Sequence, residues 1–242
     1  MLKIVRAGDR TNLKYLTEMH QLRARVFRDR LGWPVEVIAD GREVDQFDLP
    51  QAIYLLALDK SSVVIGNWRL LPSSGPTMIG TVWPQFLESL SFPSSDRVWE
   101  ASRFAVDCNS ENDIERTAQI NRATMELFIG LTELCLLAGI KEIYTMYDMR
   151  IAKLLRRLNC TPAEVSAKYK VGNQLSMVGR FVTDEKMLSA LRTATKIEET
   201  FVTFDMLTDT LFYPGFSAYP NAVFQCSIPP SNDEGMGKVN YV

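Results

Sequence analysis

Charged and aromatic side chains gather near the start of the chain in types that suit the binding of a small molecule. In the segment RARVFRDRLGW, Arg23 and Phe27 are four residues apart, so a helix presents them on one face, and Trp33 ends the segment. The segment EVDQFD then supplies Asp45 and Asp48. Charged and aromatic side chains so close together indicate a pocket for a ligand that is itself both charged and aromatic. The alternative is ordinary packing, with the rings in the core and the charges in water.

Three more charged residues stand in segments that otherwise predict buried strands. Arg69 lies in SVVIGNWRLL, and Glu100 and Arg103 lie in VWEASRFAV. Burying an unpaired charge is costly, so each of them needs an opposite charge or access to a cleft. Glu100 is the candidate general base and Asp45 the second candidate, since arginine does not accept a proton. A structural ion pair between Arg69 and Glu100 is the alternative.

The pattern of apolar residues and turn signals predicts how these residues are held. Helices are predicted at 11–31, at 110–139 with Ser110 as cap, at 149–159 with Asp148 as cap, and from about 184. Strands are predicted at 52–58, 62–71, 98–106, 141–147 and 175–182. Strands that precede, separate and follow helices predict an α/β or α+β fold with a mixed sheet. Residues 196–242 are expected to form a C-terminal extension packed on a domain of residues 1–195, frayed at its end.

The spacing of the charged residues in the predicted strand 98–106 indicates an irregularity. Glu100 and Arg103 are an odd number of residues apart, so a regular strand points them to opposite faces. Both are candidates for one cleft, and a one-residue bulge between them restores a shared face. The sequence therefore predicts a bulge in this strand.

Composition and charge exclude several classes of protein. The chain has 242 residues and a net charge of −2, so charge alone predicts neither nucleic-acid nor membrane-surface binding. The N-terminus lacks the apolar run of a signal peptide and no stretch suits a membrane span, so a cytoplasmic protein is expected. The four cysteines show no metal-ligand spacing, and no metal site is expected. His20 is the only histidine, so a Ser-His-Asp triad is excluded unless His20 serves in it.

The order of these motifs resembles one family. RxxxFxxRLGW, then ExDxFD, then an arginine in the second predicted strand, then ExSRF is similar to the pattern of the LuxI-type acyl-homoserine-lactone synthases, over roughly residues 1–185. The resemblance implies a fold like that of the GNAT N-acetyltransferases, a mixed sheet splayed open in a V. It implies an acyltransferase that joins the acyl group of a thioester to the amino group of S-adenosylmethionine, followed by lactone closure that expels methylthioadenosine. Both molecules are substrates, and no cofactor is implied.

The resemblance also implies roles for individual residues. The S-adenosylmethionine site matches six positions: Arg23, Phe27, Trp33, Asp45, Asp48 and Arg103. Glu100 matches the catalytic position and Arg69 is expected to meet the phosphopantetheine arm of the acyl donor. Thr145 and Tyr147 fall at acyl-pocket positions, and Tyr147 stands where a small hydroxyl residue is frequent, which leaves room for a short, branched or aromatic acyl group.

The acyl donor is expected to be an acyl-carrier protein, with acyl-coenzyme A as the alternative. Arg150, Lys153 and Arg157 follow helical spacing and form a candidate docking face for an acidic carrier. The junction DCNSENDIERTAQINRA lacks the glycine-rich loop with which GNAT enzymes bind the coenzyme A pyrophosphate. Two alternatives stay open: a GNAT-type acyltransferase that uses coenzyme A thioesters, and a non-catalytic small-molecule binding module of the same fold.

Overall fold

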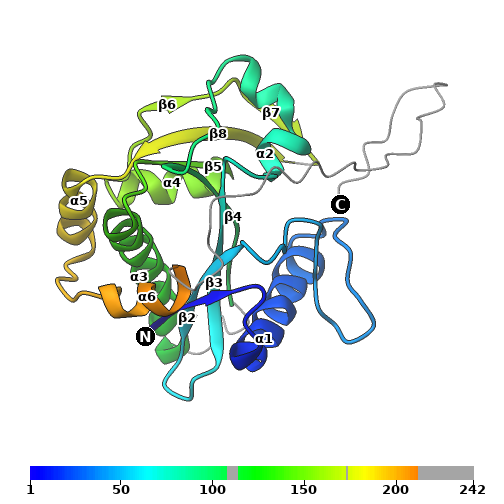
Figure 1. The fold of residues 1–242 in the computed structure, drawn as a ribbon, viewed down its shortest axis with the longest axis vertical. Coiled ribbons are helices and arrows are strands. Elements are labelled where there is room, and N and C mark those ends of the chain that lie inside the picture. Colours follow the sequence, from blue (N-terminus) through cyan, green and yellow to red (C-terminus); the bar gives the residue numbers. More distant parts are fainter. Residues whose placement is uncertain (108–113, 173, 212–242) are drawn as a thin grey trace.

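A computed structural model describes residues 1–107, 114–172 and 174–211 of the chain (Figure 1). Its strands are β1 (Leu2–Arg6), β2 (Ile53–Leu58), β3 (Val64–Pro72), β4 (Val98–Val106), β5 (Glu142–Asp148), β6 (Glu164–Val165), β7 (Tyr169–Val171) and β8 (Gln174–Val182). Its α-helices are α1 (Leu13–Ala24), α2 (Met78–Thr81), α3 (Ile114–Ala138), α4 (Met149–Arg157), α5 (Glu185–Thr195) and α6 (Phe204–Leu211). The 3-10 helices η1 (Arg10–Asn12) and η3 (Pro84–Glu88) and the π-helix η2 (Arg25–Arg30) complete the described elements.

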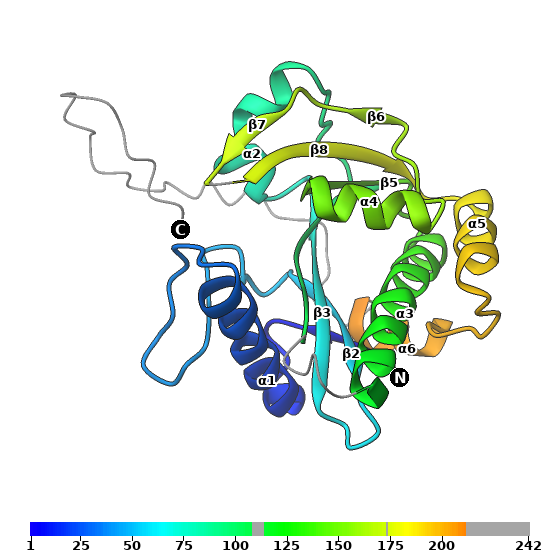
Figure 2. The ribbon, with the colours of Figure 1, turned by 180° about the vertical axis from the view of Figure 1, so that it is seen from behind.

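One mixed sheet organises the domain. The strand order is β1-β2-β3-β4-β5-β8-β6, with β7 also paired to β8, and every pairing is antiparallel except that of β4 with β5. Helices α1 and α3 both pack on β3, from opposite faces (Figures 1 and 2). Side chains therefore alternate between two cores: Tyr54 and Leu56 join Met19 of α1, whereas Leu55 and Trp68 join Phe128 of α3.

The sheet opens between its two central strands. Strands β4 and β5 pair only where Val98, Trp99 and Glu100 meet Glu142, Ile143 and Tyr144. Beyond that point β4 continues to residue 106 beside β3, and β5 continues to residue 148 beside β8, so the two strands separate. This point, here called the fork, confirms the predicted mixed sheet that is splayed open in a V.

The predicted bulge is confirmed in β4. Along β3, Asn67 pairs with Ala105 and Arg69 with Ser102, so two steps on β3 match three on β4. The extra residue is Arg103, whose φ of 56° lies in the left-handed region that non-glycine residues seldom adopt. The bulge turns Arg103 toward the α1 face, which Glu100 also faces, because Arg103 contacts residues 43 and 45 there.

Most predicted elements are present, and several were not predicted. The strand predicted at 98–106 has those bounds in the structure, and Asp148 and Asp184 cap α4 and α5. The predicted helix 11–31 is broken into η1, α1 and η2, and β1, β6, β7, α2, η3 and α6 were not predicted. The predicted Ser110 cap lies outside the described residues.

Part of the predicted C-terminal extension is described. Ile197, Val202 and Leu207 are buried in the core that contains Leu2 and Leu55. Glu133 of α3 holds this segment, since its Oε2 accepts hydrogen bonds from the backbone N–H groups of residues 201 and 202, both at 2.9 Å. The predicted fraying concerns residues beyond 211, outside the described residues, and the boundary at 195 stays a prediction.

None of the helices in the described part of the chain is long and apolar enough to cross a membrane. Within residues 1–107, 114–172 and 174–211, no three or more histidine, cysteine, aspartate and glutamate side chains are grouped so as to hold a metal ion.

Candidate active site

A cavity of about 460 Å³ lies where β4 and β5 separate. Its wall on the α1 face includes Phe27, Trp33 and Arg103, and its wall on the α3 face includes Trp68 and Phe128. The cavity therefore passes through the sheet and joins its two faces. Such a shape has room for two different ligands that meet at the fork, one on each face of the sheet.

Glu100 stands at the fork and lines the cavity. Its side chain is almost fully buried, and its Oε2 accepts a hydrogen bond of 2.7 Å from the Ile79 N–H. Its Oε1 has no hydrogen-bond partner among the described residues. Burial raises the pKa of Glu100, although the Ile79 N–H and the nearby charge of Arg69 oppose the change. A carboxylate with a raised pKa is a stronger base, which suits removal of a proton from an amine.

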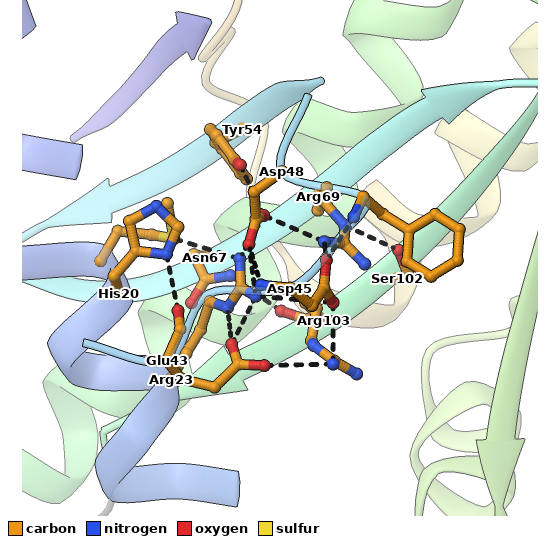
Figure 3. A network of polar contacts seen from close by, with 12 residues as sticks. His20, Arg23, Glu43, Asp45, Asp48, Tyr54, Asn67, Arg69, Ser102 and Arg103 are labelled. Atoms are coloured by element: carbon orange, nitrogen blue, oxygen red, sulfur yellow. Dashed lines mark hydrogen bonds and ion pairs between the residues drawn. The ribbon is translucent and has the colours of Figure 1, made fainter. Parts of the chain in front are cut away.

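Three arginines and three carboxylates form a buried charge network on the α1 face (Figure 3): Arg23, Arg69, Arg103, Glu43, Asp45 and Asp48. Asp48 accepts from Arg23 Nη1 at 2.7 Å and from Arg69 Nη1 at 2.9 Å. Asp45 lies 2.5 Å from Arg69 Nη1 and 2.8 Å from Arg103 Nη2. The positive and negative charges are equal in number, so the network is internally neutralised.

The charge network changes how its members ionise. Burial alone raises the pKa of a carboxyl group, but Arg23 and Arg69 outweigh burial and hold the pKa of Asp48 far below its ordinary value. Arg69 and Arg103 likewise lower the pKa of Asp45 against burial. A carboxylate with a lowered pKa is a weak base, so the electrostatics favour Glu100 over Asp45 as the proton acceptor. The alternative Arg69–Glu100 ion pair is not formed, because Arg69 pairs with the two aspartates.

Some of the site residues predicted from the sequence line the cavity, and others do not. Seven of them line it: Phe27, Trp33, Glu100, Arg103, Thr145, Tyr147 and Arg150. Four others are in the charge network but not in the wall: Arg23, Asp45, Asp48 and Arg69. Arg69 is completely buried, and its predicted contact with a phosphopantetheine arm stays a prediction.

Arg103 is held over the cavity by its neighbours. Its guanidinium carbon lies 5.4 Å from the ring centre of Phe27, within cation–π distance. Its backbone carbonyl, displaced by the bulge, accepts a hydrogen bond of 2.8 Å from Asn67 Nδ2. Asn67 is completely buried and replaces the ladder partner that a bulge removes. Its polar side chain in an apolar strand was the only sequence signal for it.

Phe27 and Trp33 form an aromatic pair at the N-terminal side of the cavity. Their rings stack with centres 5.2 Å apart and planes 10° apart. Phe27 lies in the π-helix η2, and the Trp33 N–H donates to the Phe27 carbonyl at 2.8 Å. The wider π-turn and the following Gly32, with φ 65°, bring Trp33 back onto Phe27.

One member of the charge network, Glu43, was missed in the sequence, and so was the role of His20 beside it. Glu43 bridges Arg23 and Arg103, and it is the first residue of the EVDQFD motif, so its position was a usable signal. His20 is buried and donates from Nδ1 to the Glu43 carbonyl at 2.7 Å; burial is the largest cause of its lowered pKa, so it is neutral. His20 therefore supports the loop and takes no part in a catalytic triad.

The acyl-pocket and docking candidates lie on the other side of the fork. Thr145 is the residue after Tyr144, the last β5 residue paired with β4. Tyr147 is buried beside Phe181, and its ring occupies the space over Gly179 that a Cβ atom there would need. The predicted docking residues of α4 are all exposed: Arg150, Lys153 and Arg157.

Comparison with known proteins places the chain in a family. The profile of the autoinducer synthases matches residues 9–191. An acyl-homoserine-lactone synthase of Agrobacterium fabrum is 38% identical over 172 residues, which are 70% of this chain and 80% of that protein.

Solved structures agree with the fold. The crystal structure of the acyl-homoserine-lactone synthase LasI is 28% identical, with a TM-score of 0.68 over 83% of this chain and 98% of that one. The coenzyme A-dependent acyl-homoserine-lactone synthase BjaI, solved with S-adenosylmethionine and isopentyl-coenzyme A, is 22% identical and has a TM-score of 0.71 over 86% and 97%. The second likeness is one of fold alone. The profile match and the relative of 38% identity show that the chain belongs to the autoinducer synthase family, the acyltransferases known as acyl-homoserine-lactone synthases.

Proposed function

We propose that this protein transfers an acyl group from a carrier-bound thioester to the amino group of S-adenosylmethionine. The amine nitrogen attacks the thioester carbon, the C–S bond breaks, and the carrier thiol leaves with a proton. The carboxylate oxygen then attacks the carbon next to the sulfonium, which closes the lactone and releases methylthioadenosine. No oxidant, metal or cofactor is needed for this balance.

The observation that carries the proposal is the position of Glu100 in the cavity wall at the fork. Glu100 lines the cavity at the fork, and its Oε1, which has no hydrogen-bond partner among the described residues, is the acceptor for the amine proton. A free α-amino group has a pKa of about 8, so a carboxylate of raised pKa is a sufficient base near neutrality. The backbone N–H groups of β4 that face the open gap are candidates to stabilise the oxyanion.

The α1 side of the cavity supports binding of S-adenosylmethionine. The stacked rings of Phe27 and Trp33 offer apolar and π surface to an adenine or a sulfonium. Arg103 offers its guanidinium to a carboxylate, and the charge network fixes its position through Glu43 and Asp45. In this arrangement Asp45 and Asp48 affect ligand binding by holding the arginines of the charge network in place.

The direct test is product formation by the purified protein. Incubation with S-adenosylmethionine and acyl-carrier-protein thioesters is expected to give an acyl-homoserine lactone and methylthioadenosine in equal amounts by mass spectrometry. Acylated S-adenosylmethionine without lactone would contradict the second step. Binding without any turnover would favour a binding module.

Trp33→Ala is expected to raise the KM for S-adenosylmethionine about tenfold, which corresponds to ~1.4 kcal/mol, with a smaller change in kcat. The reason is that the half-buried Trp33 ring forms cavity wall on the α1 face. Trp33→Phe keeps an aromatic ring and is the matched control, with a KM close to that of the wild type. Equal KM values in all three proteins would remove Trp33 from the site.

The donor is proposed to be an acyl-carrier protein. The exposed cations of α4 lie next to the cavity, since Arg150 belongs to its wall, and carrier proteins are acidic. The sequence between β4 and α3 has no glycine for a coenzyme A pyrophosphate loop. One relative of the same fold is described as coenzyme A-dependent, so both donors enter the test.

Reversing two charges on α4 tests whether the acyl donor is a carrier protein or coenzyme A. Lys153→Glu with Arg157→Glu is expected to lower kcat/KM for the carrier-protein donor at least about tenfold at low salt, because electrostatic attraction accelerates docking. High salt is expected to remove most of the difference. Arg10→Glu with Lys14→Glu, exposed on the N-terminal side, makes the same change in net charge and is the control. Efficient, salt-insensitive use of the coenzyme A thioester would contradict the carrier assignment.

A further inference from the structure

The backbone at Arg103 adopts a conformation that a strand alone does not favour. Its φ of 56° lies in the left-handed region, which a residue with a Cβ atom adopts only where its neighbours hold it there. A regular strand would continue the ladder between β3 and β4 and would turn the Arg103 side chain toward α3, away from the α1 face. The direction of this guanidinium therefore depends on the contacts that stabilise the bulge.

The ion pairs of Arg103 do not fix that direction by themselves. Its Nη2 lies 3.1 Å from Glu43 Oε1 and 2.8 Å from Asp45 Oδ2. Neither of these carboxylate oxygens has a hydrogen-bond partner among the described residues, and neither does Arg103 Nε. The contacts therefore supply attraction between charges without the angles of hydrogen bonds, and such attraction constrains the orientation of a side chain only weakly.

Asn67 supplies a directional contact from the neighbouring strand β3. Its Nδ2 donates to the Arg103 carbonyl at 2.8 Å. Asn67 is completely buried, and its Oδ1 has no partner within the part of the chain that the structure describes. A buried amide with its acceptor unmet adds little to stability, so stability alone explains Asn67 poorly. Asn67 is not in the cavity wall, so any effect on a ligand passes through Arg103.

We infer that Asn67 is a positioning residue for the carboxylate of S-adenosylmethionine. By holding the bulge, its amide keeps the Arg103 guanidinium in the cavity wall, over the ring of Phe27. A guanidinium recognises a carboxylate by paired hydrogen bonds of exacting geometry, so a small rotation of the Arg103 backbone weakens the contact. The inference rests on the proposed function, since the carboxylate that Arg103 meets belongs to the substrate of that reaction.

The test compares two ligands that differ only in the carboxylate. Decarboxylated S-adenosylmethionine keeps the adenosine, the sulfonium and the amine. Asn67→Leu removes the amide and keeps most of the side-chain volume. In calorimetry this variant is expected to bind S-adenosylmethionine at least about tenfold more weakly than the wild type, and the decarboxylated ligand less than about twofold more weakly. Equal loss of affinity for both ligands, or no loss for either, would overturn the inference.

Thr183→Val is the matched control. Thr183 is also buried and donates to a backbone carbonyl, that of Ile140 at 2.6 Å, but it is not in the cavity wall. Removing its hydroxyl is expected to leave the affinity for both ligands unchanged. If Asn67→Leu does not fold, Asn67→Ala removes the same donor without adding bulk, and the ratio of its two affinities decides the outcome in the same way.

A double-mutant cycle tests whether Asn67 acts through Arg103. In an Arg103→Ala background, Asn67→Leu is expected to have no further effect on the affinity for S-adenosylmethionine, because the guanidinium that it positions is gone. Additive losses would overturn the inference. A selective loss in a protein that makes no lactone would support the inference and overturn the proposed function. A protein that makes lactone and in which Asn67→Leu keeps its affinity would support the proposed function and overturn the inference.

Discussion

Glu100→Gln lowers kcat for acyl transfer by about 10²–10⁴-fold and changes the KM for S-adenosylmethionine little, if Glu100 is the general base. The substitution removes the proton acceptor and keeps the shape of the side chain. The amide oxygen of glutamine can still accept the hydrogen bond that the Ile79 N–H donates to Glu100 Oε2. Steady-state kinetics with both substrates measures the split between kcat and KM.

The stability of Glu100→Gln shows whether Glu100 acts in catalysis or stabilises the fold. The folded-state pKa of Glu100 is raised, so its contribution to stability is complete below the ordinary glutamate pKa and is lost as pH rises through the folded value. Near neutrality Glu100→Gln should therefore be as stable as the wild type, or more stable. Near-normal kcat in a stable variant would remove Glu100 from the mechanism.

Glu133→Gln provides the matched control. Glu133 is also a buried glutamate, but it binds Arg192 at 2.9 Å and lies away from the cavity. Its substitution is expected to lower the free energy of unfolding while kcat stays close to the wild-type value. Loss of kcat in both variants, in proportion to lost stability, would indicate a structural role for Glu100.

Asp48→Asn has the largest expected effect on stability, a loss of about 3–5 kcal/mol in the free energy of unfolding. Asp48 accepts hydrogen bonds from Arg23, Arg69, the Tyr54 hydroxyl and the Asp45 N–H. Asparagine keeps one acceptor oxygen and leaves the charge network with an excess positive charge in the core. Urea unfolding at neutral pH measures the loss.

The pH dependence of unfolding has a definite sign for Asp48. Its folded-state pKa is lowered, so its contribution is present above the ordinary aspartate pKa and is lost as pH falls through the folded value. The free energy of unfolding of Asp48→Asn should therefore approach that of the wild type as the pH falls.

Two further variants complete this test. Asp40→Asn, which breaks an exposed pair with Arg42, should change stability by less than about 1 kcal/mol. If Asp48→Asn does not fold, Tyr54→Phe removes one bond to Asp48 and should cost about 1 kcal/mol.

The sequence predicted five of the six members of the charge network, but neither Glu43 nor the pairing of the charges. Alternation along strands placed Arg69 and Arg103 in otherwise apolar segments, and helical spacing placed Arg23 on the same helix face as Phe27. The pairing of these arginines with acids depends on the path of the loop at residues 31–52, which has no periodicity to read. In the structure Asp45 and Asp48 pair with Arg69 of the same chain, and their predicted contacts with the ligand stay predictions.

The bulge in β4 shows what functional reasoning adds to local pattern. The odd spacing of Glu100 and Arg103 in VWEASRFAV predicts a bulge only because both residues are assigned to one cleft. The partner that stabilises the bulge, Asn67, was not found, because a hydrogen bond between neighbouring strands needs the register. Strand β1 was missed because five residues at a chain end carry too short a pattern.

The three-residue pairing between β4 and β5 has a consequence for how such an enzyme can diversify. Past Glu100 and Tyr144, neither strand has a neighbour across the gap with which its side chains must keep step. Each strand stays anchored on its other edge, to β3 or to β8. Replacing a side chain on the edge of β4 or β5 that faces the gap therefore changes the shape of the cavity and does not disturb strand pairing. New substrates become accessible by single substitutions on a frame that does not have to change.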